Sequence, residues 1–161
     1  MFETVSSAVF LVAMGVWLGG VVFFQFFTAP VIFERLPRNQ AADLIAVMFP
    51  RYYRLGYVCG AMMIVAGLHP IFSSGPAMAW LSWSLACVAL AASAYAGMIV
   101  MPRVGRLRQT AASSAGSPEH SANRSAYNRA HQLSLTLNAA VLVLLIAQAL
   151  VYAWRVKSIV S

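Results

Sequence analysis

The chain has 161 residues, of which 61% are hydrophobic and only 9% are charged. Soluble domains carry about 25% charged residues, so this composition excludes an ordinary soluble domain and indicates an integral membrane protein. The net charge of +7 would suggest nucleic-acid binding in a soluble protein. Here the arginines gather between apolar stretches, so we expect the lipid bilayer as the partner and no nucleic acid.

Three long stretches contain no Asp, Glu, Lys or Arg, and they cover residues 4–33, 55–102 and 130–154. A helix of about 20 residues crosses a bilayer, so the first and last stretches can each hold one span. The middle stretch can hold two, because a Ser-Ser-Gly-Pro turn signal at 73–76 divides it. The sequence therefore predicts a single transmembrane domain over 1–161, an all-α integral membrane bundle of four spans at about 5–27, 50–72, 77–101 and 131–154.

The basic residues predict the orientation of this bundle. Nine arginines lie between spans one and two or between spans three and four, whereas Arg155 and Lys157 follow the last span. The positive-inside rule then places both of these loops in the cytoplasm and both termini outside, as in a multi-pass protein of the bacterial inner membrane. We expect the loop arginines Arg103, Arg106 and Arg108 to attract anionic lipid.

The first half of the chain contains two predicted packing features. Gly15 and Gly19 form a Gly-x-x-x-Gly pair, whose small residues let two helix backbones approach closely. We expect this pair to pack within the monomer, with a homo-oligomer as the alternative. Pro30 kinks the first helix, which continues to Arg35. In the first cytoplasmic loop, the apolar spacing predicts a short amphipathic helix at 40–48 with Asn39 as its N-cap.

The ends of the middle spans are marked by prolines and aromatic residues. Pro50 suits the first residue of span two, where a missing N–H costs nothing. The aromatic rings and arginines of 49–54 are typical of an interfacial belt, although Arg51 or Arg54 could instead turn inward to bind an anionic group. Residues 109–125 are rich in Ser, Ala, Gly and Asn, so we expect a flexible cytoplasmic loop there.

A polar cluster is predicted where the last span begins. His131, Ser134 and Asn138 share one helix face, which Leu142, Leu145 and Ala149 continue. Polar groups at the mouth of a membrane helix need partners from the other helices. Gln25 of span one and the arginines on the same side of the membrane can be these partners. The candidate cluster is His131, Ser134, Asn138, Gln25, Arg51 and Arg103.

The chemistry of this cluster predicts packing or binding rather than catalysis. The chain has four acidic residues, none within a span, so we expect no buried carboxylate relay, no catalytic residues and no metal ligands. His69 and His131 belong near opposite membrane faces, which disfavours bis-histidine haem within one subunit. The function predicted is a non-enzymatic membrane protein whose cluster acts in helix packing or in binding a ligand or partner. Haem or copper handling, or a small oligomeric transporter, are the alternatives.

Four short motifs follow one another along the chain. They are Leu36-Pro37-Arg38, Phe49-Pro50 with Tyr52-Tyr53, Pro102-Arg103 closing span three, and His131, Ser134 and Asn138 opening span four. In this order and at these loop lengths they resemble the bacterial relatives of transmembrane protein 205. The resemblance implies a four-helix membrane protein without a defined reaction, whose eukaryotic namesake is associated with resistance to platinum drugs.

This chain departs from the pattern at one position, because Met101 stands where some relatives carry an acidic residue. That substitution removes an acidic partner for Arg103 or His131. A more distant similarity to copper-resistance D-type membrane proteins and four-helix haem-pathway enzymes implies haem or copper as the alternative cofactor.

Overall fold

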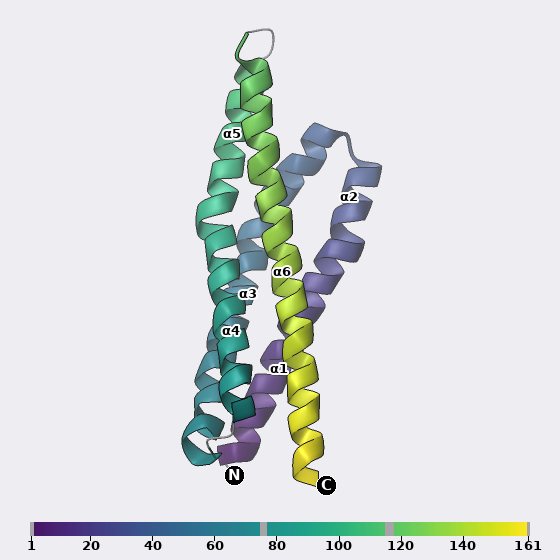
Figure 1. The fold of residues 1–161 in the computed structure, drawn as a ribbon. Coiled ribbons are helices and arrows are strands. Elements are labelled where there is room, and N and C mark those ends of the chain that lie inside the picture. The colour runs from purple at the N-terminus through teal and green to yellow at the C-terminus, as the bar shows by residue number, and fades with distance from the viewer. Residues whose placement is uncertain (1, 75–76, 115–117, 161) are drawn as a thin grey trace.

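The computed structural model describes residues 2–74, 77–114 and 118–160 of the chain. All regular structure in these ranges is helical (Figure 1). The first half consists of α1 (Phe2–Phe23), a π-helical segment η1 (Phe24–Thr28), α2 (Ala29–Arg35) and α3 (Arg38–Ser74). The second half repeats this order with α4 (Ala77–Tyr95), a π-helical segment η2 (Ala96–Val100), α5 (Met101–Ser113) and α6 (His120–Val160).

The helices run back and forth along one long axis. Both termini lie at one end of the molecule, and the α2–α3 turn and the facing ends of α5 and α6 lie at the other (Figure 1). α3 packs against both α1 and α4, and α6 packs against α4 and α5. The hairpin of α5 and α6 reaches beyond the α2–α3 turn (Figure 1).

Three helical stretches of the described residues are long and apolar enough to cross a membrane. They are Glu3–Arg35, Ala77–Ser113 and His120–Arg155. Each combines a mean hydropathy near 2 with more than the roughly 20 residues that a bilayer requires. The chain therefore has the helices of a membrane protein.

Small residues allow α4 to pack closely in this bundle. Its buried residues alternate in steps of three and four along the helix, a spacing that keeps one seam facing a neighbour; they are Ala79, Ser82, Ala86, Ala89 and Ser93. On the described part of α6 the buried residues are Ala130, Ser134, Val141, Leu145 and Gln148. The buried face of α6 thus differs from the predicted one, because Val141 and Gln148 lie deeper than Leu142 and Ala149.

Glycines let α3 and α1 approach closely, but not the glycines predicted for this role. Trp17, only 3% exposed, lies against Gly56 and Gly60, where an added Cβ would come within 2.9 and 3.0 Å of its ring. Gly15 and Gly19 are exposed, and a Cβ at either would meet nothing within 4 Å. The prediction that this pair packs within the monomer is therefore wrong. The rotation of α1 that buries Trp17 turns both glycines outward.

The helix boundaries of the first half agree with the prediction at the end of the first helix and differ from it at α3. The first helix continues past Pro30 to Arg35, as predicted, and the chain is extended at Leu36. The short amphipathic helix at 40–48 is not separate, because α3 runs without a break from Arg38 to Ser74. Asn39 therefore lies inside α3 instead of capping a helix, and Pro50 lies within it.

A continuous buried face explains why α3 tolerates Pro50. Ala41, Ile45 and Tyr53 are buried at steps of four and eight residues on either side of the proline. Pro50 removes the donor for the carbonyl of Ala46, but both residues are exposed, where solvent or lipid headgroups can satisfy that carbonyl. The loss of one outward-facing hydrogen bond is smaller than the gain from burying this face.

The segment 109–125 was expected to be a flexible loop; residues 115–117 of it lie outside what the structure describes, and the rest is largely helical. α5 continues to Ser113 and α6 begins at His120. Val104 and Ala130 are buried between these helices, with Leu107 and Tyr127 packed against them. This apolar contact supports two helices whose composition by itself would not predict order.

Candidate functional site

Two π-helical segments define the level of the candidate site. In each, the last backbone N–H reaches back five residues, from Ala29 to the carbonyl of Phe24 and from Met101 to that of Ala96. A proline follows immediately, Pro30 in α2 and Pro102 in α5. Proline lacks an N–H, and its ring clashes with the carbonyl four residues earlier, so a wider turn relieves the clash. Both long helices are thus widened one step before a proline.

Asn138 of α6 is the centre of a hydrogen-bonded cluster that we call the Asn138 cluster: Gln25, Tyr52, Tyr53, Met101, Ser134 and Asn138. The Tyr52 hydroxyl donates to Asn138 Oδ1 at 3.3 Å. Asn138 Nδ2 donates to the Tyr53 hydroxyl at 3.1 Å and to the carbonyl of Ser134 at 2.9 Å. One carboxamide therefore joins α6 to two consecutive tyrosines of α3.

The same cluster reaches both π-helical segments. Gln25, in η1, donates from Nε2 to the backbone carbonyl of Asn138 at 3.1 Å. Ser134 donates from Oγ to Sδ of Met101 at 3.4 Å. Met101 follows η2 directly. A chain of polar contacts therefore crosses the bundle from η1 to the end of η2.

Aromatic rings pack around the tyrosines of this cluster. The Phe24 ring lies 4.9 Å from that of Tyr52 and 5.3 Å from that of Phe49, centroid to centroid. The Tyr53 ring stacks on Phe49 at 5.6 Å. Gly97 of η2 completes the packing, because a Cβ there would lie 2.7 Å from Cγ of Tyr53. The absence of a side chain at Gly97 lets η2 lie against the tyrosines.

Three of the six predicted cluster residues meet in space, namely Gln25, Ser134 and Asn138. His131 stacks on Tyr127, with ring centroids 5.8 Å apart, and takes no part in the hydrogen bonds around Asn138. His131 and Asn138 do share a helix face, but seven residues separate them by about 10 Å along the axis. The histidine thus lies outside the cluster, nearer the tip of the α5–α6 hairpin.

The two predicted arginines also lie outside the cluster. Arg51 is exposed and donates back along its own helix to the carbonyl of Val47 at 3.2 Å, and Arg103 is exposed. Arg54 likewise donates to the carbonyl of Pro50. Of the loop arginines, Arg108 forms an ion pair of 2.9 Å with Asp43.

The family-motif positions fall at the ends and centre of this arrangement. Leu36 and Pro37 separate α2 from α3, and Arg38 begins α3. Pro102 follows η2. The sequence pattern indicated Tyr52 and Tyr53 only as belt and motif residues, yet they form two of the three interhelical hydrogen bonds of Asn138. The mixture of aromatic and polar residues in 49–54 did not indicate that these two side chains point into the bundle.

A second buried polar pair was missed by the sequence reasoning. Gln148 of α6 is 1% exposed and Ser82 of α4 is 2% exposed, and Gln148 Nε2 donates to Ser82 Oγ. Gln148 Oε1 has no hydrogen-bond partner within the described residues. A signal was present, since Gln148 interrupts the apolar run 139–151. The side chain of His69, predicted near this end of the bundle, lies outside what the structure describes.

The Asn138 cluster contains phenols, carboxamides, a hydroxyl and a thioether, without a formal charge. These groups can orient helices or hydrogen-bond a small ligand, but together they offer no nucleophile paired with a base. Among the described residues, no group of three or more His, Cys, Asp and Glu side chains is placed to hold a metal ion. Cys59 is buried in the apolar core and Cys87 is half-buried, and both are free thiols.

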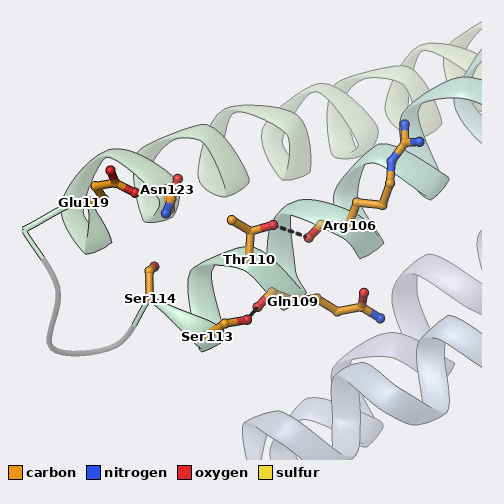
Figure 2. Close-up of a pocket in the computed structure, with 7 residues that line it drawn as sticks. All are labelled: Arg106, Gln109, Thr110, Ser113, Ser114, Glu119 and Asn123. Carbon is orange, nitrogen blue, oxygen red and sulfur yellow. Dashed lines mark hydrogen bonds between the residues drawn. The ribbon is translucent and has the colours of Figure 1, made fainter.

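One open depression lies away from the cluster, between the facing ends of α5 and α6 (Figure 2). It measures about 600 Å³ and is lined by Arg106, Gln109, Thr110, Ser113, Ser114, Glu119 and Asn123. Thr110 and Ser113 donate to carbonyls of their own helix, those of Arg106 and Gln109. The side chains in Figure 2 do not converge on a common point, so this depression has no built binding site.

Comparison with known proteins gives a family without an assigned reaction. A family described as "Domain of unknown function (DUF4149)" matches residues 12–113, which include both π-helical segments and Tyr52-Tyr53. An "Uncharacterized protein" of Aquifex aeolicus (strain VF5) is 26% identical over 145 residues, which cover 90% of this chain and 95% of that protein. No solved structure matches the chain.

Proposed function

Because the chain belongs to the DUF4149 family, whose description names no reaction, we propose a function from the geometry of the Asn138 cluster. The protein is a non-enzymatic, multi-pass membrane protein, and the cluster sets how its helices pack at the arginine-rich end. One observation carries this proposal: a single carboxamide on α6 bonds Tyr52 and Tyr53 of α3, and the carbonyl of the same residue accepts from Gln25.

The proposal includes a fourth span, formed by α3. This helix has 37 residues, and no charged residue occurs from Leu55 to Ser74. It packs against both α1 and α4, whose sequences are apolar enough to cross a membrane. Because α3 packs between two helices that cross the bilayer, it lies in the bilayer with them. Four spans then place both termini outside and the arginines of both connections in the cytoplasm of a bacterial inner membrane.

Fusions to alkaline phosphatase, which is active only outside the cytoplasm, test this topology. We expect activity for fusions after Ser74 and after the last residue, and no activity for fusions after Arg35 and after Ala112. An inactive fusion after Ser74 would show that α3 does not cross the membrane.

In a bilayer the hydrogen bonds of Asn138 contribute to the free energy of helix packing. A polar group surrounded by hydrocarbon has no water to bond, so its partners must come from other helices. Measured interhelical hydrogen bonds in membranes contribute about 0.6–2 kcal/mol each. The side chain of Asn138 makes two of them, to Tyr52 and Tyr53. Removing this carboxamide should therefore loosen α3 from α6 by about 1–3 kcal/mol.

Asn138→Leu tests the packing role, and Asn128→Leu is its control. Both residues lie on α6, but Asn128 is exposed. We expect Asn138→Leu to lower the free energy of unfolding in detergent by about 1–3 kcal/mol. The control should change it by no more than about 0.5 kcal/mol. Equal stability of the two variants would exclude helix packing as the role of the cluster.

The resemblance to relatives of transmembrane protein 205 supports a role for the same cluster. Residues from two of the four motifs that carry it meet there, Tyr52 and Tyr53 from the second and Ser134 and Asn138 from the fourth. Pro102 of the third motif follows Met101, the partner of Ser134. Motifs scattered over more than eighty residues of sequence thus contribute to one group of contacts.

A further inference from the structure

The segment η1–α2 is attached to the bundle more loosely than its counterpart in the second half. Neither η1 nor α2 has a buried residue. α2 packs against α3, and apart from η1, which it continues, no helix in the described ranges contacts it as closely. In η2 and α5, by contrast, Ala96, Val100 and Val104 are buried. Local contact density of this kind determines which part of a protein opens at the lowest free energy.

Few contacts hold η1 in place. Gln25 Nε2 bonds the carbonyl of Asn138 at 3.1 Å, and this bond ties η1 to α6. On the side facing α3, the Phe24 ring packs on Phe49 and Tyr52. The large side chains Phe26, Phe27 and Val31 are more than half exposed. The Phe27 ring stacks on that of Phe23 in the preceding turn, with centroids 5.9 Å apart.

The backbone of η1 is suited to bending. Ala29 bonds Phe24 five residues back, and Pro30 has no N–H to offer, so the helical ladder is weakest where α2 begins. Exchange of one turn between π and α geometry turns the following helix by about 100°, one residue of an α-helix. The other end of α2 is a second break in the helix, because the chain is extended at Leu36 before Pro37.

We propose that η1 is a hinge and α2 a movable arm, which the Gln25–Asn138 hydrogen bond holds against the bundle. The inference rests on the proposed role of the Asn138 cluster. When this hydrogen bond breaks, α2 turns between the helix breaks at its two ends and moves relative to α6. The rest of the arginine-rich end stays in place, because Arg108 of α5 holds the start of α3 through Asp43 and the carbonyl of Asn39.

The arm connects the membrane interior to its surface. Movement of η1 changes the hydrogen bond at Asn138, which shares its side chain with Tyr52 and Tyr53. Tyr53 lies against Gly97 of η2. A change at one π-helical segment therefore reaches the other through a continuous set of contacts, the physical requirement for coupling.

Distance measurements between spin labels on the full-length protein in nanodiscs test the arm. Cys59 and Cys87 are replaced by Ala, and cysteines are placed at the exposed positions Glu34 on α2 and Thr136 on α6. We expect Gln25→Leu to broaden and lengthen the Glu34–Thr136 distribution. A reference pair, Gln109 on α5 with Thr136, should keep its distribution. Gln132→Leu, which changes an exposed glutamine of α6, is the matched control and should alter neither pair.

Hydrogen exchange provides a second measurement that needs no label. Backbone amides of α2 should exchange roughly tenfold faster in Gln25→Leu than in the unmodified protein, while those of α5 keep their rates. Pro30→Ala restores the missing N–H and should slow exchange across η1 and α2.

The outcomes separate the arm from the packing role. An unchanged Glu34–Thr136 distribution in Gln25→Leu would overturn the arm, and so would an equal change in the α5 reference pair, which would mean general loosening. If Asn138→Leu destabilises the protein while Gln25→Leu leaves α2 in place, the packing role stands without the arm.

Discussion

The two π-helical segments of this chain have the same local chemistry and different surroundings. Each has five residues, ends on an N–H that reaches back five positions and is followed at once by proline. α2, however, has 7 residues and none is buried, whereas α5 has 13 residues and buries Val104 against α6. Proline thus determines where a long helix is interrupted. The neighbouring helix determines whether the interruption is rigid.

The partner helices account for this difference. α6 returns alongside α5 over most of its length, and Val104, Leu107, Tyr127 and Ala130 fill the space between them. α3 contacts α2 much less than α6 contacts α5. The same break in two helices therefore leaves α5 anchored and α2 weakly held. Substitutions on the two sides should differ accordingly.

The largest difference is expected between Gly97, which lies in η2, and Gly20, which precedes η1 on α1. In Gly97→Ala the new Cβ would overlap Tyr57 Oη and lie 2.7 Å from Cγ of Tyr53. Overpacking of this kind lowers the free energy of unfolding by about 3 kcal/mol. In Gly20→Ala the new Cβ would lie 3.3 Å from Cδ2 of Leu55, the end of a flexible side chain, so the expected change is below about 1 kcal/mol.

Thermal unfolding in detergent measures both glycine variants, with Gly105→Ala as a control for the substitution itself. A Cβ at Gly105 meets nothing within 4 Å, so replacement by alanine should stabilise the helix by about 0.5–1 kcal/mol. Similar destabilisation by Gly97→Ala and Gly20→Ala would contradict the asymmetry between the two segments.

A smaller difference is expected between two valines, one on α5 and one on α2. Val104 of α5 is buried, whereas Val31 of α2 is 54% exposed. Val104→Ala removes two buried methyl groups and should lower the unfolding free energy by about 1–2 kcal/mol. Val31→Ala should change it by less than about 0.5 kcal/mol. Chemical denaturation of each variant measures these values, and a larger effect of Val31→Ala would mean that α2 packs as tightly as α5.

The smallest effect is expected at the ion pair that links α5 to α3. Asp43 is 73% exposed, and such pairs contribute between about 0 and 1 kcal/mol. Asp43→Asn should therefore cause a loss within that range, which disappears at high salt because the charges are screened. Glu34→Gln on α2 is the control, and we expect no salt-dependent change. A salt-independent loss in Asp43→Asn would mean that Asp43 acts through something other than this ion pair.

Much of the local structure follows from the sequence. Long stretches without charge predict membrane-length helices, and three of them have the length and hydropathy to span a bilayer. Pro30 predicts a kink rather than an end, and Leu36-Pro37 predicts a break. Gln25, Ser134 and Asn138 were identified because a polar side chain within an apolar run needs a partner, and these three residues meet. These features depend only on residues near one another in the chain, so one sequence is enough to find them.

Tertiary packing decided the rest. The rotation of α1 buries Trp17 and turns Gly15 and Gly19 outward. Packing against neighbouring helices keeps α3 helical across Pro50. It also makes α5 and α6 helical where composition suggested a loop. The inward orientation of Tyr52 and Tyr53 and the pairing of Gln148 with Ser82 also depend on the helix alongside. Periodicity gives the faces of a helix, but the neighbour at each depth determines which face is buried, and that neighbour comes from a distant part of the chain.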